Sequence, residues 1–228
     1  MKKTAFLFIS MMLLACGTVA AQQIGIADIE QGWQKTTIKV KNGGNNPSVM
    51  QLLRAFNAQW ETNAANTIIA TAGDNEEFVL GWEEGTSPVY VDCVDFNTAW
   101  FNHGDTADQR LETRTYQREN GHTLFAVSLE QLNPEQKAFC CFYDYNPQTQ
   151  TLTPEEVPYK NLKRKWKDSS ISYNLGLEYD LTVIVEEITK KGEKWYHHYG
   201  WNGTKHTFDH SGPDFYSDGE SDEEEDGV

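Results

Sequence analysis

The sequence predicts an α+β protein in which an N-terminal helical segment packs on one or two antiparallel β-meander sheets with an internal duplication. Apolar residues follow a helical spacing in the first third of the chain. Short stretches rich in aromatic and β-branched residues then alternate with turn sequences. Such short connections favour antiparallel neighbours over parallel crossovers. A β-sandwich and a small propeller-like repeat are the alternatives for the strand-rich part.

The helical segment is expected over 22–75, and its clearest helix lies at 46–60. Asn46 suits the N-cap and Pro47 suits the first helical position. An apolar stripe at helical spacing follows and should face the core; it comprises Val49, Leu52, Leu53, Phe56 and Trp60. A further short helix is expected at 63–73, ended by Gly73.

The antiparallel β region is expected over 76–215, because the strand-like stretches there are bounded by turn sequences such as ENGH and WNGT. The expected strands are 77–82, 89–96, 110–117, 123–132, 138–145, 150–155, 171–188, 194–201 and 205–210.

A repeat organises this region, since 127–152 aligns with 183–208 without a gap. The identical pairs are Val127/Val183, Glu130/Glu186, Tyr143/Tyr199, Asn146/Asn202 and Thr151/Thr207. Both copies read as an apolar strand, a polar turn, an aromatic strand and a short strand, which indicates a duplicated meander. A fainter third copy ends at 90–97. Cys140 and Cys141 have no cysteine counterparts, but the aromatic residues and the Asn turn of the same stretch recur in the second copy, so we interpret the stretch as scaffold.

The N-terminus has the features of a signal peptide over 1–21. Lys2 and Lys3 precede an apolar stretch that is too short to span a bilayer as a stable helix. Two processing routes compete: cleavage before Gln22, which we favour, and lipidation of Cys16 within LLAC, which resembles a bacterial lipobox. We therefore expect an exported bacterial protein, periplasmic or extracellular, with an outer-membrane lipoprotein as the alternative.

The mature chain has no second apolar run of membrane-spanning length and is strongly acidic. Loss of Lys2 and Lys3 moves the formal charge from −15 to −17. Such a chain repels nucleic acid and anionic membrane surfaces, so a nucleic-acid partner is excluded. The segment 216–228 contains seven acidic residues and almost nothing apolar, and we expect it to be a disordered tail.

The mature cysteines are Cys93, Cys140 and Cys141, an odd and sparse set that does not indicate a disulfide scaffold. One bridge from Cys93 to either neighbour is an alternative. We favour one buried and one half-exposed thiol, because adjacent residues in a strand point to opposite faces.

Histidines near the C-terminus are candidate metal ligands. A two-residue hairpin loop at 202–203 would pair Tyr199 with His206 and make His197 a diagonal neighbour of His206. This metal pair lacks a third ligand and matches no metal motif, so a half-buried aromatic sheet face is the favoured interpretation. No cofactor is predicted.

Aromatic residues form a second candidate site, a surface that stacks on sugar rings; its members are Tyr199, Trp201, Tyr143 and Tyr145. Core packing is the competing interpretation and is favoured. A third candidate is a basic stretch at 159–167, which is either a plain connector between the repeats or a dock for an acidic glycan, a lipid headgroup or the acidic tail. Its docking residues are Lys163, Arg164, Lys165 and Lys167.

The sequence contains no serine-hydrolase, zinc-protease or phosphate-loop motif, and it places no catalytic residue. Its adjacent carboxylate pairs face opposite sides of a strand and do not form an acid/base couple by themselves. We therefore expect a non-catalytic binding or interaction protein whose partner is a glycan or an envelope protein. A secreted hydrolase acting on glycan or peptide is the alternative.

Overall fold

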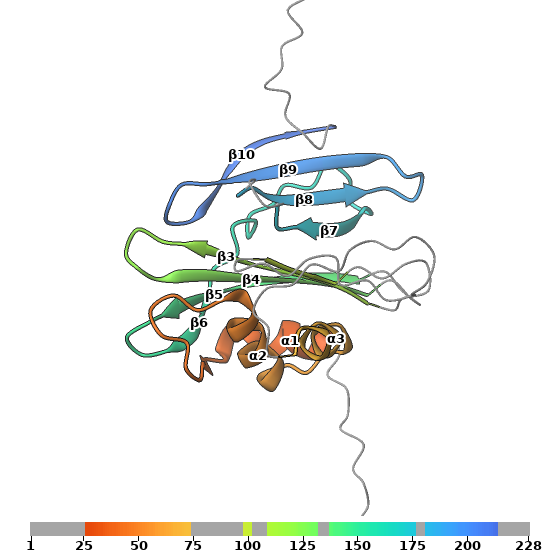
Figure 1. The fold of residues 1–228 in the computed structure, drawn as a ribbon. Coiled ribbons are helices and arrows are strands. Elements are labelled where there is room, and N and C mark those ends of the chain that lie inside the picture. Colours follow the sequence, from red (N-terminus) through yellow and green to blue (C-terminus); the bar gives the residue numbers. More distant parts are fainter. Residues whose placement is uncertain (1–25, 74–97, 102–108, 132–136, 177–180, 214–228) are drawn as a thin grey trace, which may run out of the picture.

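The computed structural model describes residues 26–73, 98–101, 109–131, 137–176 and 181–213. They form three layers, with helices below a six-stranded sheet and a four-stranded sheet above it (Figure 1). Both sheets are antiparallel. The predicted α+β fold is therefore confirmed. The signal segment, Cys16, Cys93, the expected strands at 77–82 and 89–96, the third repeat copy and the acidic tail lie outside the described residues.

The helical layer contains α1 (Ile26–Gly32), a 3-10 turn at Trp33–Lys35, α2 (Val49–Gln59) and α3 (Asn63–Ala72). The apolar stripe of α2 faces the core as predicted. Gly73 ends α3 in a positive-φ conformation (φ 57°), also as predicted. None of the helices that the structure describes is long and apolar enough to cross a membrane.

The start of α2 differs from the prediction, which placed the cap at Asn46. Ser48 is the N-cap: its hydroxyl accepts from the Gln51 backbone N–H at 3.3 Å, and the Gln51 side chain accepts from the Ser48 N–H at 3.1 Å. This reciprocal capping box satisfies two otherwise unpaired backbone donors. The Asn46 cap with Pro47 in the first turn is therefore wrong by two residues.

The lower sheet has the strand order β1-β6-β5-β4-β3-β2. Its strands are β1 (Ile38–Lys39), β2 (Thr98–Phe101), β3 (Gln109–Gln117), β4 (Thr123–Gln131), β5 (Lys137–Asn146) and β6 (Thr151–Glu155). The upper sheet has the order β10-β9-β8-β7. Its strands are β7 (Ser170–Asn174), β8 (Val183–Ile188), β9 (Lys194–Trp201) and β10 (His206–Gly212).

The expected strand at 171–188 is two strands, β7 and β8, which pair with each other. The chain turns after Asn174, whose side chain accepts a hydrogen bond from the Gly176 N–H at 2.7 Å. Gly176 has φ 81°, a conformation that a residue with a side chain rarely adopts. An Asn-x-Gly sequence therefore follows β7 directly, inside an otherwise continuous strand pattern.

The two repeat copies form the meanders β4-β5-β6 and β8-β9-β10, and they lie in different sheets. Equivalent residues face the same way: Tyr143 packs toward the helices beneath its sheet, and Tyr199 packs toward the lower sheet beneath its own. The gapless alignment does not extend to strand pairing. Val127 pairs with Cys141, whereas Val183 pairs with Tyr199, two residues beyond the expected position.

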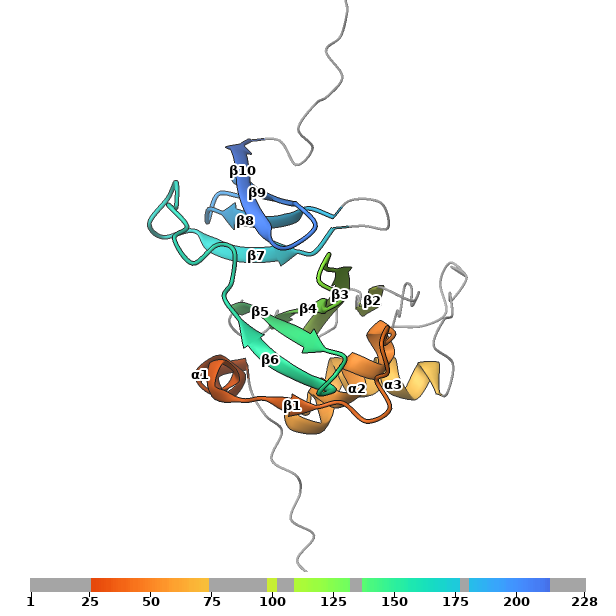
Figure 2. The ribbon, with the colours of Figure 1, turned by 90° about the vertical axis from the view of Figure 1, so that its left-hand side faces the viewer.

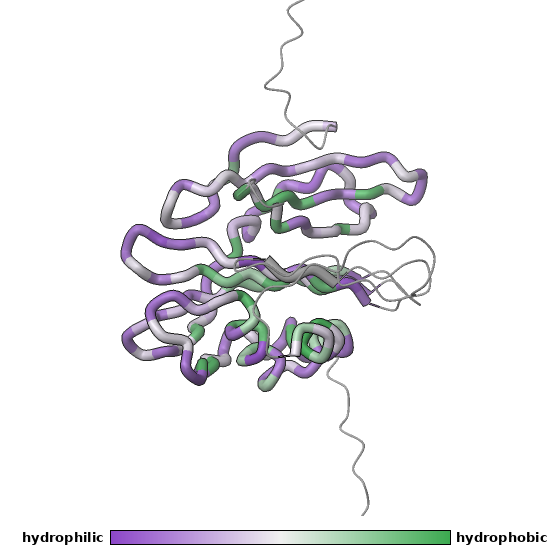
Figure 3. The backbone as a smooth tube through the Cα atoms, in the orientation of Figure 1, coloured by the Kyte–Doolittle hydropathy of each residue, from purple (hydrophilic) through white to green (hydrophobic). Residues whose placement is uncertain are grey.

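Two apolar clusters hold the layers together. One fills the space between the helices and the lower sheet, and the other lies between the two sheets. Among the described residues, hydrophobic stretches lie in the helices and in both sheets, while the hairpin turns are mostly hydrophilic (Figure 3). Because the lower sheet is covered on both faces, Cys141 is buried in the first cluster and Cys140 in the second. The expected half-exposed thiol is therefore wrong.

The upper sheet contacts the lower one through β7, which packs across β5 and β4. The linker 156–169 joins β6 to β7 and runs between the sheets at one side of the molecule (Figure 2). Part of the contact is polar. The Tyr116 hydroxyl donates to the Leu175 carbonyl oxygen at 2.7 Å, and the Glu112 carboxylate accepts from the Leu175 N–H at 2.9 Å.

Candidate functional site

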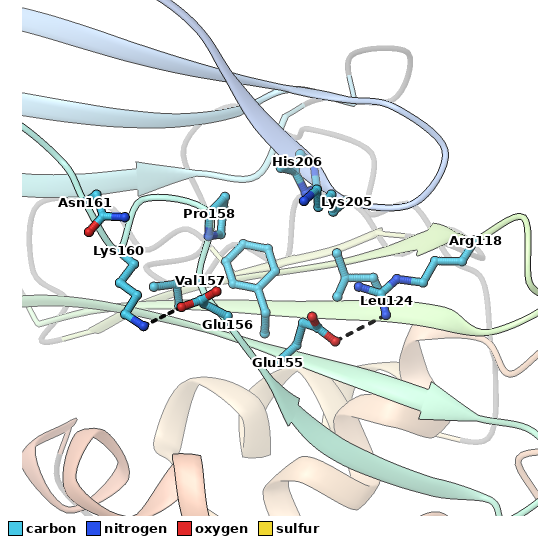
Figure 4. A pocket seen from close by; sticks show the side chains of 11 residues that line it. Arg118, Leu124, Glu155, Glu156, Val157, Pro158, Lys160, Asn161, Lys205 and His206 are labelled. Atoms are coloured by element: carbon cyan, nitrogen blue, oxygen red, sulfur yellow. Dashed lines mark hydrogen bonds and ion pairs between the residues drawn. The ribbon is translucent and has the colours of Figure 1, made fainter.

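Two cavities border the linker, and both are lined by Pro158 and Asn161. One is lined by both sheets, and the other lies between the linker and the upper sheet. The charged cavity has a volume of about 270 Å³. Its polar lining comprises Arg118, Glu155, Glu156, Lys160, Lys205 and His206 (Figure 4). The aromatic cavity has a volume of about 510 Å³. Its lining includes Leu162, Lys163, His197, Tyr199, Phe208 and Ser211.

Ion pairs within the lining neutralise most of the charged cavity. Arg118 Nη1 donates to Glu155 Oε2 at 3.3 Å and to Asp144 Oδ1 at 2.5 Å, just behind the lining. Lys160 Nζ donates to Glu156 Oε1 at 2.5 Å (Figure 4). Each carboxylate of the lining therefore has a cationic partner. The lining contains both positive and negative groups and is not dominated by charge of one sign.

His206 lines the charged cavity from β10 and is neutral at physiological pH. Its Nε2–H donates to the Leu181 carbonyl oxygen at 3.0 Å, which fixes the proton on Nε2. Burial lowers the pKa of His206 to about 4, and the positive charges of Arg114 and Arg118 act in the same direction. The Nδ1 atom is buried and has no hydrogen-bond partner among the described residues.

The carboxylates of this cavity are poorly suited to glycoside hydrolysis. That chemistry needs one carboxyl group held protonated as the general acid and a second held as carboxylate. The hydrogen bond from Lys160 lowers the pKa of Glu156, and Glu155 is bound to Arg118. Burial does raise the pKa of Glu112, to about 7, but Glu112 lies between the sheets and lines neither cavity.

The aromatic cavity contains an exposed aromatic ring. The Phe208 side chain is 59% exposed, although its ring packs edge-on against Tyr199 with centroids 5.7 Å apart. Tyr199 itself is buried and belongs to the cluster between the sheets. A large apolar ring beside a cavity with polar side chains such as His197 and Lys163 is the arrangement typical of small-ligand sites.

Glu187 anchors the linker beside this cavity and is fully buried. Its carboxylate accepts hydrogen bonds from two side chains, Ser169 Oγ at 2.7 Å and His197 Nε2 at 2.7 Å. It also accepts from the backbone N–H groups of Lys165 and Trp166, at 2.8 and 3.2 Å. Burial raises the pKa of Glu187, but these hydrogen bonds outweigh burial and lower it overall. The carboxylate stands between Ser169 and His197, so these side chains do not form a nucleophile–base pair.

The four candidate aromatic residues do not share a surface. Tyr143 and Tyr145 are fully buried beneath the lower sheet. The Tyr143 hydroxyl accepts from Trp60 Nε1 at 3.2 Å, and the Tyr145 hydroxyl donates to the Gly44 carbonyl oxygen at 2.8 Å. The core interpretation holds for these two. Tyr199 and Trp201 lie on the inner face of the upper sheet, and Tyr199 reaches a cavity.

The candidate metal pair is also separated, because the hairpin has four loop residues instead of two. Trp201 pairs with His206 and Tyr199 with Phe208, so the predicted Tyr199–His206 pair is wrong, and His197 is not a diagonal neighbour of His206. The Asn202 side chain accepts hydrogen bonds from the N–H groups of residues 204 and 205, which stabilises the longer loop. His197 instead lies opposite Ser211. Over the described part of the chain, no three His, Cys, Asp or Glu side chains gather as metal ligands.

The basic residues of the linker have unequal surroundings. Arg164 binds the backbone oxygen and the hydroxyl of Ser169, and the Lys165 ammonium lies 3.4 Å from the centroid of the Trp195 ring. Lys163 is exposed and lines the aromatic cavity, and Lys167 is exposed. The linker is therefore partly structural and partly available to an anion.

Sequence reasoning missed Phe208 and Arg118. Phe208 is equivalent to Leu152 in the repeat, but Leu152 is fully buried and Phe208 is exposed, a difference that only the layer order decides. Arg118 follows an alternation of polar residues in β3, at Arg110, Glu112 and Arg114, which face the upper sheet. Polar residues at every second position of this strand were the sequence signal that could have identified Arg118.

No protein-family model matches the chain, and no curated protein matches it either. Among solved structures, a domain of an uncharacterized protein from Porphyromonas gingivalis W83 is similar, with a TM-score of 0.38 and 11% sequence identity. The match covers 64% of this chain and 87% of that chain. At this TM-score the likeness assigns no function.

Proposed function

We propose that the chain is an exported, non-catalytic binding protein that holds a glycan or another envelope component in the aromatic cavity. The observation that carries the proposal is the exposed ring of Phe208, which packs against Tyr199 and lines a cavity of about 510 Å³ together with it. A water-exposed phenyl ring is a site where burial by a ligand releases free energy.

The surroundings suit a polyhydroxylated ligand better than a purely apolar one. His197, Lys163, Asn161 and Ser211 line the same cavity and supply hydrogen-bonding groups around the ring. The imidazole of His197 is oriented by its bond to Glu187, which reduces the ordering that a ligand must impose. The absence of catalytic geometry in both described cavities supports a binding function over turnover.

The test is retention of the exported chain, residues 22–228, on an immobilised panel of glycans and cell-wall fragments. Phe208→Ala is the informative variant, because the side chain is exposed and its loss leaves the core intact. Tyr199→Ala is avoided, since Tyr199 is buried and its removal would leave a cavity in the core. Tyr199→Phe keeps the ring and removes only the hydroxyl.

Leu181→Ala is the matched control, because Leu181 is the other exposed large apolar side chain described, at 42%, and lies outside the aromatic cavity. We expect selective retention that falls at least tenfold with Phe208→Ala and stays unchanged with Leu181→Ala. Equal retention of the Phe208→Ala and Leu181→Ala variants would contradict the proposal. The absence of retention on any surface would contradict it too. Release of a hydrolysed product would favour the hydrolase alternative.

A further inference from the structure

Lysines cluster at one end of the upper sheet. Ser170 pairs with Ile188, and Ile188 pairs with Lys194, so the end of the linker and the β8–β9 turn meet at the same end of the sheet. The cluster, called here the lysine-rich end, comprises the exposed residues Lys163, Lys165, Lys167, Lys190 and Lys191. The carboxylates Asp168 and Glu193 offset only part of this charge. This concentration of cations is unusual in a chain with a formal charge of −15.

The described chain leaves the fold at this same end. Ser211 pairs with His197, and Gly212, the last residue of β10, pairs with Tyr196. The next residue of β9 toward the turn is Trp195, and the Lys165 ammonium lies over its ring. Ser211 and Lys163 also line the aromatic cavity together. The chain beyond residue 213 therefore starts beside two of the lysines.

That chain is the acidic segment 216–228, whose seven carboxylates complement the lysine-rich end. A random coil of 13 residues has an end-to-end distance of about 20 Å, and the five residues from Lys163 to Lys167 span about 14 Å at most. Tethering gives such a segment an effective concentration in the millimolar range, so even weak charge pairing at the surface is populated.

We propose that the acidic segment 216–228 binds the lysine-rich end of its own chain. Charge complementarity and the exit point of β10 carry this assignment, and it does not depend on the identity of the ligand. The segment acts as an internal competitor that an acidic external partner must displace.

The test compares the wild-type chain with a full-length amide-tail variant in which only the charge of the segment is removed. Its substitutions are Asp218→Asn, Glu220→Gln, Asp222→Asn, Glu223→Gln, Glu224→Gln, Glu225→Gln and Asp226→Asn. A fluorescent peptide with the sequence of residues 214–228 is titrated into both proteins at low ionic strength. We expect the amide-tail variant to bind the peptide at least fivefold more tightly, with an affinity that falls steeply as salt is added.

A second pair of variants locates the contact in the amide-tail background. Lys167→Gln combined with Lys191→Gln should weaken peptide binding about tenfold. Lys35→Gln combined with Lys41→Gln, which removes equal charge from two exposed residues on either side of β1, should change it less than twofold. Neither pair touches the residues that line the aromatic cavity.

Equal peptide affinity of the wild-type and amide-tail proteins would overturn the proposal, as would equal effects of the two lysine pairs. Binding of anionic vesicles by both proteins without binding of the peptide would also overturn it and would assign the lysines to an external surface. No glycan is present in these titrations. A negative result would therefore contradict only the binding of the acidic segment and would leave the proposed glycan binding to its own test.

Discussion

The imidazole ring of His206 packs edge-on against the phenol ring of Tyr116, with centroids 4.4 Å apart, and joins the upper sheet to the lower one. Tyr116 also donates to the Leu175 carbonyl oxygen, and Glu112 on the same strand accepts from the Leu175 N–H. The contact between the sheets therefore contains a buried histidine and a buried glutamate. Burial disfavours the charged form of each and so moves their pKa values in opposite directions.

His206 should make the fold less stable in mild acid. Its pKa is lowered from 6.5 to about 4, so between these values the unfolded chain binds a proton that the folded chain does not. The associated stability is complete above about pH 6.5 and is lost as the pH falls toward 4, by about 3 kcal/mol in all. Urea unfolding of wild type and His206→Gln across this range should show a shallower acid slope for the variant. Parallel slopes would contradict the assignment.

Glu112 should act in the opposite sense. Its pKa is raised from 4.5 to about 7, so the folded chain retains a proton that the unfolded chain has released. The associated stability is complete below about pH 4.5 and is lost as the pH rises through 7, by about 3 kcal/mol. Glu112→Gln keeps an acceptor for the Leu175 N–H and removes the ionisation. We expect the variant to gain stability over wild type near pH 8 and to match it near pH 4.5.

Removal of the Glu187 carboxylate should destabilise the protein strongly. Glu187→Ala leaves the buried Ser169 hydroxyl, the His197 imidazole and two backbone N–H groups without their acceptor. Breaking a buried charge network of this kind costs about 3–5 kcal/mol. Glu193→Ala, an exposed carboxylate in the neighbouring turn, should change the unfolding free energy by about 0.5 kcal/mol or less. Similar midpoints for the two variants in urea would show that Glu187 does not anchor the linker.

Both thiols of the Cys140–Cys141 pair should be unreactive in the folded protein. Each is buried, on opposite faces of β5, and burial raises the pKa of both thiols and so removes the reactive thiolate. Iodoacetamide at about pH 8 should leave both unlabelled in the native state and label both in concentrated urea, as read by peptide mass analysis. Native labelling of either residue would require local opening of the sheet.

Local patterns in the sequence predicted most of the elements. The stripe from Val49 to Trp60 predicted the buried face of α2, because a helix brings every third and fourth residue to one side. The recurrence of Val127 and Tyr143 at Val183 and Tyr199 predicted two meander units. A helix boundary was misplaced where two nearby residues can both act as the N-cap, as Asn46 and Ser48 can for α2.

The candidate site could not be predicted in the same way, because it depends on how the layers stack. The repeat makes Tyr143 and Tyr199 equivalent, yet one is enclosed beneath helices and the other borders a cavity. A change of two loop residues at 202–205 moved His206 away from His197 and onto Tyr116. Hairpin register and layer order are set by contacts between distant residues, which hydropathy along the chain does not contain.

The sequence by itself determined the fold class, the helical and strand segments and the duplication, because these follow from side-chain periodicity and local turn chemistry. Only the tertiary structure decided that the two copies stack as separate sheets, that both cysteines are enclosed, and that Phe208 stays in water beside a cavity. Whether a side chain is buried depends on which layer packs over its segment, and the sequence of that segment alone does not reveal this.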